Sequence, residues 1–370
     1  MELEVIEEKR RAHQDNIDNS KSQEERNQYG QFATPYELAR ELMTFAEELM
    51  DVERVDFLEP AVGTGPFLSA LFDTFPDRKI GQVRGIEMDG DYVQAARQLW
   101  SETPVQLLES DFTKLDPPTS REEQFNLLVT NPPYVRHHHL AGTDKKRLQK
   151  RSEEIIGGGI PSGYTGLYCY FMYLAHRWLR EGGIAGWLVP TEFTEVGYGN
   201  HLRRYLHERV TLLRVHQYRP EDLQFDSALV SSCVVWYRKK EPDDDYEVEF
   251  SFGGTHANPE RVLTLNSSTL GDLKKWNLLS LDNGGADNGH PTVSDIFEIK
   301  RGIATGNNDF FILNEEEVEK LDLPDRFIKP ILPSPRYLEG TIIDANDDGT
   351  PDIEKSLWLL SCLLTEDAVK

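Results

Sequence analysis

The stretch Val55-Asp56-Phe57-Leu58-Glu59-Pro60-Ala61-Val62-Gly63-Thr64-Gly65-Pro66-Phe67-Leu68 decides the fold class. Its first seven residues predict a buried strand. The two glycines that follow allow a tight turn and let the backbone approach a ligand where a Cβ atom would collide. No Gly-Lys-Ser/Thr comes next, so the turn is not a phosphate-binding P-loop. The segment is typical of the first strand and turn of a ligand-binding α/β sheet.

Two further apolar strands are predicted downstream, and each ends in residues suited to a nucleoside. The run that starts at Val83 ends at Glu87, and a carboxylate at the end of the second strand of a nucleotide-binding sheet usually holds a ribose. The third strand, residues 105–108, runs toward Asp111 and Phe112, an acceptor beside a ring that could hold an adenine. Open α/β sheets bind ligands at the carboxyl ends of their strands, so we expect these side chains to share one site.

A fourth apolar run, residues 125–129, leads into Asn131-Pro132-Pro133-Tyr134. Each proline fixes its own φ and moves the residue before it out of the helical region. The Asn131 side chain and the Pro132 carbonyl are therefore expected to project from a stiff turn, as two rigid oxygen acceptors beside an aromatic ring. Such a site suits a planar substrate with an exocyclic amino group. The alternative is a rigid turn with a packed tyrosine.

In this order, the motifs resemble the amino-group DNA methyltransferases that modify adenine at N6, in the subgroup of Eco57I-like type II modification methylases. The resemblance extends over residues 25–240, with a weaker echo at residues 302–308. The segments that carry it are Gly30-Gln31-Phe32-Ala33-Thr34-Pro35, Leu58–Phe67, Gly85–Asp89, Ser110–Phe112, Asn131–Tyr134, Gly182–Pro190 and Gln224–Val230.

The resemblance implies S-adenosyl-L-methionine as the cofactor and assigns a role to each matching residue. The methionine end would lie beside Thr34 and Pro35, its ammonium on Glu59, and the ribose on Glu87. The adenine of the cofactor would contact Met88, Asp111 and Phe112. The implied cofactor-binding residues are Thr34, Pro35, Glu59, Pro60, Ala61, Gly63, Gly65, Glu87, Met88, Asp111 and Phe112.

The same resemblance places the catalytic residues at Asn131, Pro132, Pro133, Tyr134 and Phe225. Asn131 and the Pro132 carbonyl would bind the amino group of the target base. Tyr134 would stack on that base, and Phe225 would supply a second aromatic wall.

A basic segment follows the proline turn in an otherwise acidic chain. In such a chain it is the best candidate for phosphate contacts, the alternative being a solvated helix face. The candidates are Arg136, Lys145, Lys146, Arg147, Lys150 and Arg151. Three adjacent histidines, residues 137–139, point in alternating directions in an extended segment and so favour a polar loop near DNA over a metal site. Residues 344–355 resemble the start of an EF-hand, but Lys355 stands where the bidentate Glu is needed, so an acidic hairpin turn is predicted and no metal site.

Composition sets the domain organisation. We expect an N-terminal helix over residues 1–26, a catalytic domain over 27–240 and a target-recognition domain over 241–370 that is incomplete. The fold class predicted is α/β: a Rossmann-like S-adenosylmethionine-dependent methyltransferase sheet with one antiparallel strand at residues 230–237, plus a partial C-terminal α+β recognition domain. Three cysteines without paired spacing fit a reducing cytoplasm, and no run is long enough to span a membrane.

The net charge of −24 is unusual for a nucleic-acid enzyme, which normally has a basic face. Residues 241–370 hold 11 basic and 27 acidic side chains, so the region expected to read DNA is the more acidic one. Adaptation to high salt is one explanation. A recognition surface completed by a further subunit is another.

The predicted function is site-specific methylation of adenine N6 in double-stranded DNA by a cytoplasmic enzyme, within a restriction-modification or phage-defence system. A cognate restriction endonuclease or a further recognition subunit is the expected protein partner. Three alternatives stay open. They are a cytosine-N4 DNA methyltransferase, a protein glutamine-amide methyltransferase and a non-catalytic DNA-binding subunit.

Overall fold

The computed structural model describes residues 3–273 except 23–24, 27–28, 157–158, 220–230 and 244, and beyond them 275–277, 279, 296, 298, 305–333, 342–347, 349–353 and 356–361. The chain divides into two compact units, Met1–Gly284 and Gly285–Lys370. Within the described residues, no helix is long and apolar enough to cross a membrane.

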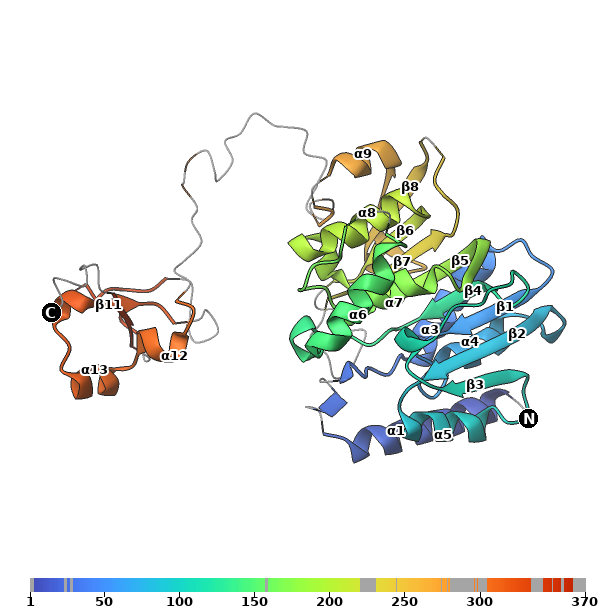
Figure 1. The fold of residues 1–370 in the computed structure, drawn as a ribbon, viewed down its shortest axis with the longest axis horizontal. Helices are drawn as coiled ribbons and strands as arrows, with labels where there is room; N and C mark the ends of the chain where they lie inside the picture. Colours follow the sequence, from blue (N-terminus) through green and yellow to red (C-terminus); the bar gives the residue numbers. More distant parts are fainter. Residues whose placement is uncertain are drawn as a thin grey trace. The chain divides into compact units, whose positions relative to one another are not determined.

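The first unit is built on a single sheet whose described strands follow the order β3-β2-β1-β4-β5-β7-β6-β8-β9 (Figure 1). The strands are β1 Val55–Glu59, β2 Ile80–Glu87, β3 Val105–Glu109, β4 Phe125–Thr130, β5 Leu179–Pro190, β6 Thr211–Gln217, β7 Ser232–Arg238, β8 Glu247–Gly254 and β9 Pro259–Asn266. The first five lie parallel, and β7 runs antiparallel between β5 and β6. The predicted Rossmann-like sheet is therefore confirmed, including the antiparallel strand.

Helices cover both faces of this sheet because successive strand residues point to opposite sides. On one face Phe57, Leu127 and Val129 pack in a cluster with side chains of α3, α4 and α5. On the other, Leu58 and Leu128 join a second cluster with residues of α6, α7 and α8. These helices are α3 Tyr36–Leu49, α4 Pro66–Thr74, α5 Gly90–Leu99, α6 Gly142–Glu153, α7 Leu167–Ala175 and α8 Asn200–Glu208.

The sheet continues past the domain boundary expected at residue 240. Strand β8 pairs parallel with β6, and β9 pairs antiparallel with β8, so a second antiparallel strand lies at this edge, followed by α9 Ser267–Asp272. The acidic segment after Lys239 is thus a connection between β7 and β8 rather than a linker. Its charge is explained by exposure: Glu241 and Asp243 pair with Arg209 and Lys240 at the surface.

The N-terminal helix is also part of the first unit. Helix α1 Leu3–Ser20 packs against α4 and α5, so the predicted helix is present but ends earlier than residue 26. Cys169 and Cys233 are buried free thiols, whereas Cys362 lies outside the described residues.

The second unit contains a three-stranded sheet in the order β10-β12-β11, antiparallel throughout. Its described elements are α12 Asn308–Phe311, β10 Ile312–Leu313, α13 Glu315–Leu321, β11 Ile328–Ile331 and β12 Leu357–Leu360. This agrees with the predicted C-terminal α+β domain. Ala345 and Pro351 form an antiparallel bridge, consistent with the predicted acidic turn.

Candidate active site

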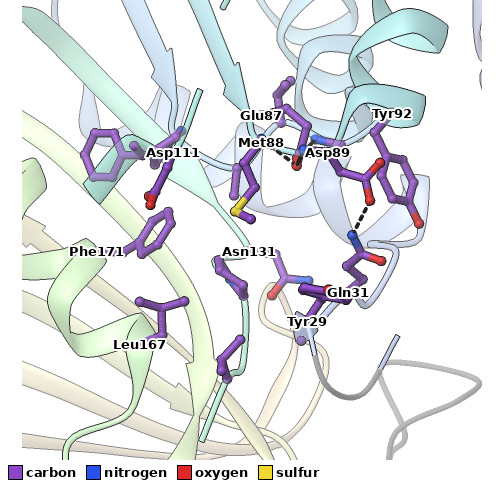
Figure 2. A pocket seen from close by; sticks show the side chains of 18 of the residues that line it. Tyr29, Gln31, Glu87, Met88, Asp89, Tyr92, Asp111, Asn131, Leu167 and Phe171 are labelled. Carbon is purple, nitrogen blue, oxygen red and sulfur yellow. Dashed lines mark hydrogen bonds between the residues drawn. The ribbon is translucent and has the colours of Figure 1, made fainter. Parts of the chain in front are cut away.

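A cavity of about 670 Å³ opens at the carboxyl ends of β1, β2, β3 and β4, the edge at which open α/β sheets bind ligands. Figure 2 shows Asp111, Phe171 and Leu167 on one side and Asp89, Tyr92 and Gln31 on the other. The predicted residues that line it are Thr34, Glu59, Pro60, Ala61, Gly63, Glu87, Met88, Asp111, Phe112, Asn131, Pro133 and Arg147. Motifs from four strands therefore share one site, as their order in the sequence predicts.

The turn after β1 needs its glycines for two different reasons. Gly63 has φ +53° and Gly65 has φ +93°, both in the left-handed region that favours glycine. A Cβ atom on Gly63 would meet nothing within 4 Å, whereas one on Gly65 would lie 2.6 Å from Nε1 of Trp100. Gly63 thus leaves open space beside the cavity, and Gly65 permits close packing behind it.

Glu59, at the end of β1, is a buried acidic residue that forms no ion pair with any residue that the structure describes. Its side chain is 1% exposed, and Oε2 has no hydrogen-bond partner among the described residues. Burial, and then repulsion from Glu87, raise the pKa of Glu59 well above its ordinary value, with Arg10 partly offsetting them. A ligand ammonium placed here would satisfy the carboxylate.

Glu87, at the end of β2, is held by backbone amides. Oε2 accepts from the Gly63 N–H at 3.0 Å, and Oε1 accepts from Met88 and Asp89 N–H at 2.9 Å each. Burial raises the pKa of Glu87 despite these bonds. The amides fix the carboxylate at the cavity wall, where its remaining lone pairs can accept from ligand hydroxyls. The Met88 side chain beside it is 62% exposed.

The opposite wall is formed after β3. Oδ1 of Asp111 caps a short 3-10 turn by accepting from the N–H and hydroxyl of Thr113. Phe112 is buried and packs against Phe171 with ring centroids 5.2 Å apart. Phe171 and Leu167, on α7, also line the cavity. An apolar slot with one carboxylate at its edge suits a flat base with an amino group.

The Asn131 side chain has a fixed orientation. Its Nδ2 donates to the Phe32 carbonyl at 3.0 Å and to Oγ1 of Thr34 at 3.1 Å. Its Oδ1 is buried and has no partner among the described residues. The amide oxygen is therefore an acceptor left over for a ligand, and the Gly30–Pro35 segment is what orients it.

Gly30 holds this segment against the proline turn. Its φ is +64°, its carbonyl accepts from the Tyr134 N–H at 3.3 Å, and a Cβ atom there would lie 2.3 Å from that nitrogen. Only glycine allows so close an approach.

Tyr134 lies in the core next to the cavity rather than on its wall. The residue is 8% exposed, and its hydroxyl donates to the Leu188 carbonyl at 3.0 Å. Burial raises the pKa of the Tyr134 phenol well above its ordinary value, so it remains protonated. The packed-tyrosine alternative describes this conformation, and the stacking role stays a prediction that requires one ring face to become accessible.

Two of the six predicted phosphate-binding residues have structural partners instead. Arg147 donates to the Thr113 carbonyl at 2.7 Å, and Arg151 donates to the Leu115 carbonyl at 2.6 Å, so both tie α6 to the segment after β3. Charge pattern alone could not reveal these carbonyls. The remaining four, Arg136, Lys145, Lys146 and Lys150, form no ion pair with described residues.

Several other predicted residues lie off the cavity or outside the described residues. Pro35 precedes α3, Pro132 is buried in the turn, and Phe225 falls in the segment 220–230 that is not described.

Residues that sequence reasoning missed line the cavity as well. They are Gln14, Lys21, Gln31, Asp89, Tyr92, Leu167 and Phe171. In the part of the chain that is described, no group of three or more His, Cys, Asp or Glu could hold a metal ion.

Comparison with solved structures supports the fold. The chain superposes on the type IIG restriction endonuclease BpuSI with a TM-score of 0.53 at 17% identity, covering 91% of this chain and 44% of that one. A protein from Listeria monocytogenes, described as a class I S-adenosylmethionine-dependent methyltransferase, gives a TM-score of 0.53 at 16% identity, covering 70% and 77%.

Two curated relatives match most of this chain. The type II methyltransferase M.AccI of Acinetobacter calcoaceticus is 23% identical over 363 residues, covering 94% of this chain and 64% of the relative. M.XamI of Xanthomonas campestris pv. amaranthicola is 25% identical over 309 residues, covering 81% and 56%. The chain thus spans less than two thirds of the length of either relative.

S-adenosyl-L-methionine is the cofactor that this fold and these relatives imply, and the cavity fits it. A zwitterionic amino acid needs an anionic partner for its ammonium, which Glu59 supplies through an Oε2 atom that has no partner among the described residues. A ribose needs acceptors, and Glu87 lines the cavity beside the open space at Gly63. An adenine needs an apolar slot and an acceptor, which Phe171 and Asp111 provide.

Family models cover well over half of the sequence. The Eco57I restriction-modification methylase model matches residues 82–224, and the model of the C-terminal domain of the type II methyltransferase M.Eco57I matches residues 273–368. The second match corresponds largely to the second compact unit. With these matches, the relatives and the fold in agreement, the chain belongs to the Eco57I-like family of type II restriction-modification methylases.

Proposed function

We propose that this chain transfers a methyl group from S-adenosylmethionine to the N6 amino group of an adenine in double-stranded DNA, as the modification enzyme of a restriction-modification system. The observation that carries the proposal is the Asn131 amide. Its nitrogen is occupied by two acceptors of the Gly30–Pro35 segment, while its buried oxygen is unpartnered among the described residues of the same cavity.

An exocyclic amino group is a poor nucleophile because its lone pair is delocalised into the ring. Oδ1 of Asn131 and the Pro132 carbonyl would each accept one of its two N–H groups. Two acceptors that hydrogen-bond both hydrogens favour a pyramidal nitrogen, whose lone pair can then attack the methyl group. No general base is needed to begin, since the nitrogen becomes acidic once it carries a methyl group.

Bound S-adenosylmethionine would supply an electrophilic methyl group. The protein would hold the two reactants in one orientation, which can lower the activation free energy of methyl transfer by roughly 7–11 kcal/mol. Glu59 would accept from the amino-acid ammonium, Glu87 from the ribose hydroxyls and Asp111 from the adenine amino group. These three carboxylates lie at or just after the ends of three different strands, β1, β2 and β3, and line one cavity.

The target base would have to leave the duplex, because its amino group cannot reach a buried acceptor from within the helix. Unstacking costs a few kcal/mol, and phosphate contacts hold the duplex in place meanwhile. Arg136, Lys145, Lys146 and Lys150, which form no ion pair with the described residues, are on α6 and the turn leading to it. His139 of that turn and Asp144 of α6 line the cavity, so the four cations belong to elements that border it.

Target recognition would come from the second unit, which corresponds to the C-terminal domain model of the family. Because this unit is acidic, we infer either that its recognition surface makes few phosphate contacts or that a further subunit completes that surface. A cognate endonuclease that recognises the same DNA sequence would be the functional partner.

The test is methyl transfer to mixed genomic DNA, at low and at molar salt, followed by digestion to nucleosides and mass spectrometry. We expect N6-methyladenine. N4-methylcytosine in its place would keep the reaction class but overturn the assignment of the base. A chain that binds the cofactor and duplex but transfers no methyl group under either salt condition would overturn the proposal that this chain is itself the catalyst.

A further inference from the structure

Helix α1 buries polar side chains where a packed helix ordinarily buries apolar ones. Glu7 and Arg10 are 7% and 3% exposed, beside a single buried apolar residue of the helix, Ile6. The inward stripe continues at helical spacing, so its members lie on one face. They are Glu7, Arg10, Gln14 and Asp18, and Lys21 follows directly after the last residue of the helix. A helix that buries charged side chains in this way needs polar partners in the domain it covers.

The first partner is the glycine turn after β1. Arg10 donates to both carboxylate oxygens of Glu7 at 2.7 Å and to Oγ1 of Thr64 at 3.0 Å. The Thr64 hydroxyl in turn donates to Oε1 of Gln14 at 2.8 Å. Two side chains of α1 thus fix the one residue that separates Gly63 from Gly65.

The second partner is the ribose side of the cavity. Nε2 of Gln14 donates to Oδ1 of Asp18 at 3.0 Å, and that oxygen also accepts from the Tyr92 hydroxyl at 2.8 Å. Lys21 forms an ion pair with Asp89. Asp89 also accepts from Gln31 at 2.8 Å (Figure 2). A single hydrogen-bonded chain therefore runs along α1 from the glycine turn to α5.

We propose that helix α1 forms one wall of the cofactor site, with Gln14 as a further cofactor-binding residue and Arg10 as a positioning residue for the Thr64 turn. The inference rests on the cofactor assigned above and goes beyond the residues that the motifs identify. Gln14, Lys21, Thr64 and Tyr92 all line the cavity. The Gln14 amide nitrogen donates to Asp18 and also hydrogen-bonds the Tyr92 hydroxyl, so the amide has a fixed orientation. Its Oε1 accepts from Thr64, and the second lone pair of that oxygen is the acceptor it offers to a ligand hydroxyl.

The charges support the same division of roles. Arg10 is held by both oxygens of Glu7, so its charge is already matched and it does not replace the cation that Glu59 lacks. Its guanidinium therefore shapes the turn, and Glu59 remains available to a ligand ammonium. Arg10 lies close enough to stabilise the ionised form of Glu59 once that ammonium is bound.

The test measures the affinity of the full chain for S-adenosylhomocysteine by calorimetry. Gln14→Ala should weaken binding about 3- to 10-fold, the loss of one neutral hydrogen bond. Asn16→Ala is the matched control, because it removes an exposed amide from the same helix and should leave the affinity within about 2-fold. Hydrogen exchange of residues 3–20 should slow when the ligand is bound.

A second variant addresses the positioning role. The pair Glu7→Leu and Arg10→Met removes both buried charges together, which avoids leaving one of them unpaired. We expect its unfolding temperature without ligand to stay near that of the unaltered chain while its affinity falls.

The inference fails if Gln14→Ala binds like Asn16→Ala and exchange in α1 is unaffected by the ligand. A chain that methylates DNA while giving that result would retain the proposed function and lose only the role of α1. An unaltered chain that does not bind S-adenosylhomocysteine at all would overturn both.

Discussion

Replacing Glu59 with glutamine should make the unliganded protein more stable at neutral and alkaline pH, although it removes a residue of the site. Glu59 is 1% exposed, and its Oε2 is unpartnered among the described residues. Burial, and secondarily Glu87, raise its pKa well above the ordinary 4.5. The folded protein therefore holds this proton more tightly than the unfolded chain does.

The sign and size of the effect follow from proton linkage. Above pH 4.5 the unfolded chain releases the proton first, so the free energy of unfolding falls as the pH rises toward the folded-state pKa. The slope is at most about 1.4 kcal/mol per pH unit for one group. Glutamine has no such proton. As the pH rises, the free energy of unfolding of Glu59→Gln should therefore increase relative to that of the unaltered chain. The increase is at most about 1.4 kcal/mol per pH unit and ends at the folded-state pKa of Glu59.

Cofactor binding should respond in the opposite direction. Loss of a hydrogen bond to a charged ligand group costs about 1.5–3 kcal/mol, which is roughly a 10- to 150-fold loss of affinity. Because Glu59 must ionise to pair with an ammonium, binding to the unaltered chain should also release a proton into the buffer. Glu59→Gln should abolish that release.

Urea unfolding between pH 5.5 and 8.5 measures the first effect, and calorimetry in buffers of different ionisation enthalpy measures the second. Glu53→Gln is the control, since Glu53 is an exposed carboxylate just before the same strand. The reasoning is refuted if Glu59→Gln parallels Glu53→Gln at every pH, or if it binds the cofactor as tightly as the unaltered chain.

Three more predictions follow from single contacts. Gly30→Ala should destabilise the fold by about 1–3 kcal/mol, since alanine at a positive φ is strained and its Cβ would collide with the Tyr134 nitrogen; thermal unfolding measures it, and an unchanged melting temperature would contradict it. Tyr134→Phe should cost about 0.5–1.5 kcal/mol by removing the buried hydrogen bond to the Leu188 carbonyl yet retain methyl transfer; loss of transfer in a folded protein would show that the hydroxyl is needed in the reaction. Lys146→Ala with Lys150→Ala should reduce the slope of log affinity against log salt by about two for duplex DNA, and an unchanged slope would remove these lysines from the interface.

The strand-end motifs were predictable because each one directly follows an apolar run. Parallel strands bring their carboxyl ends to one edge, so Glu59, Glu87, Asp111 and Asn131 had to meet if the runs formed such a sheet. The proline turn also predicted a rigid acceptor. What it could not predict was that the Phe32 carbonyl and Thr34 occupy the amide nitrogen of Asn131, because that contact joins residues nearly a hundred positions apart.

Other parts of the site depend on packing that leaves little trace in a local pattern. The apolar segment 167–175 forms the buried helix α7, yet nothing in its uniform hydrophobicity distinguishes Phe171, which lines the cavity, from its neighbours in the core. Strands β8 and β9 follow an acidic connection that is typical of a linker. Helix α1 did carry a signal, namely polar residues at positions 7, 10, 14 and 18, but an exposed face gives the same spacing.

The central claim is that one cavity holds a cofactor on one side and presents the Asn131 amide to a target amino group on the other. The most direct test compares Asn131→Ala with the unaltered chain, measuring affinity for S-adenosylhomocysteine and methyl transfer to duplex DNA in the same preparation. We predict affinity within a few-fold of the unaltered chain and a loss of transfer of about 100-fold or more, as for other removed groups that stabilise a transition state. Transfer that survives the substitution while the cofactor still binds would contradict the account.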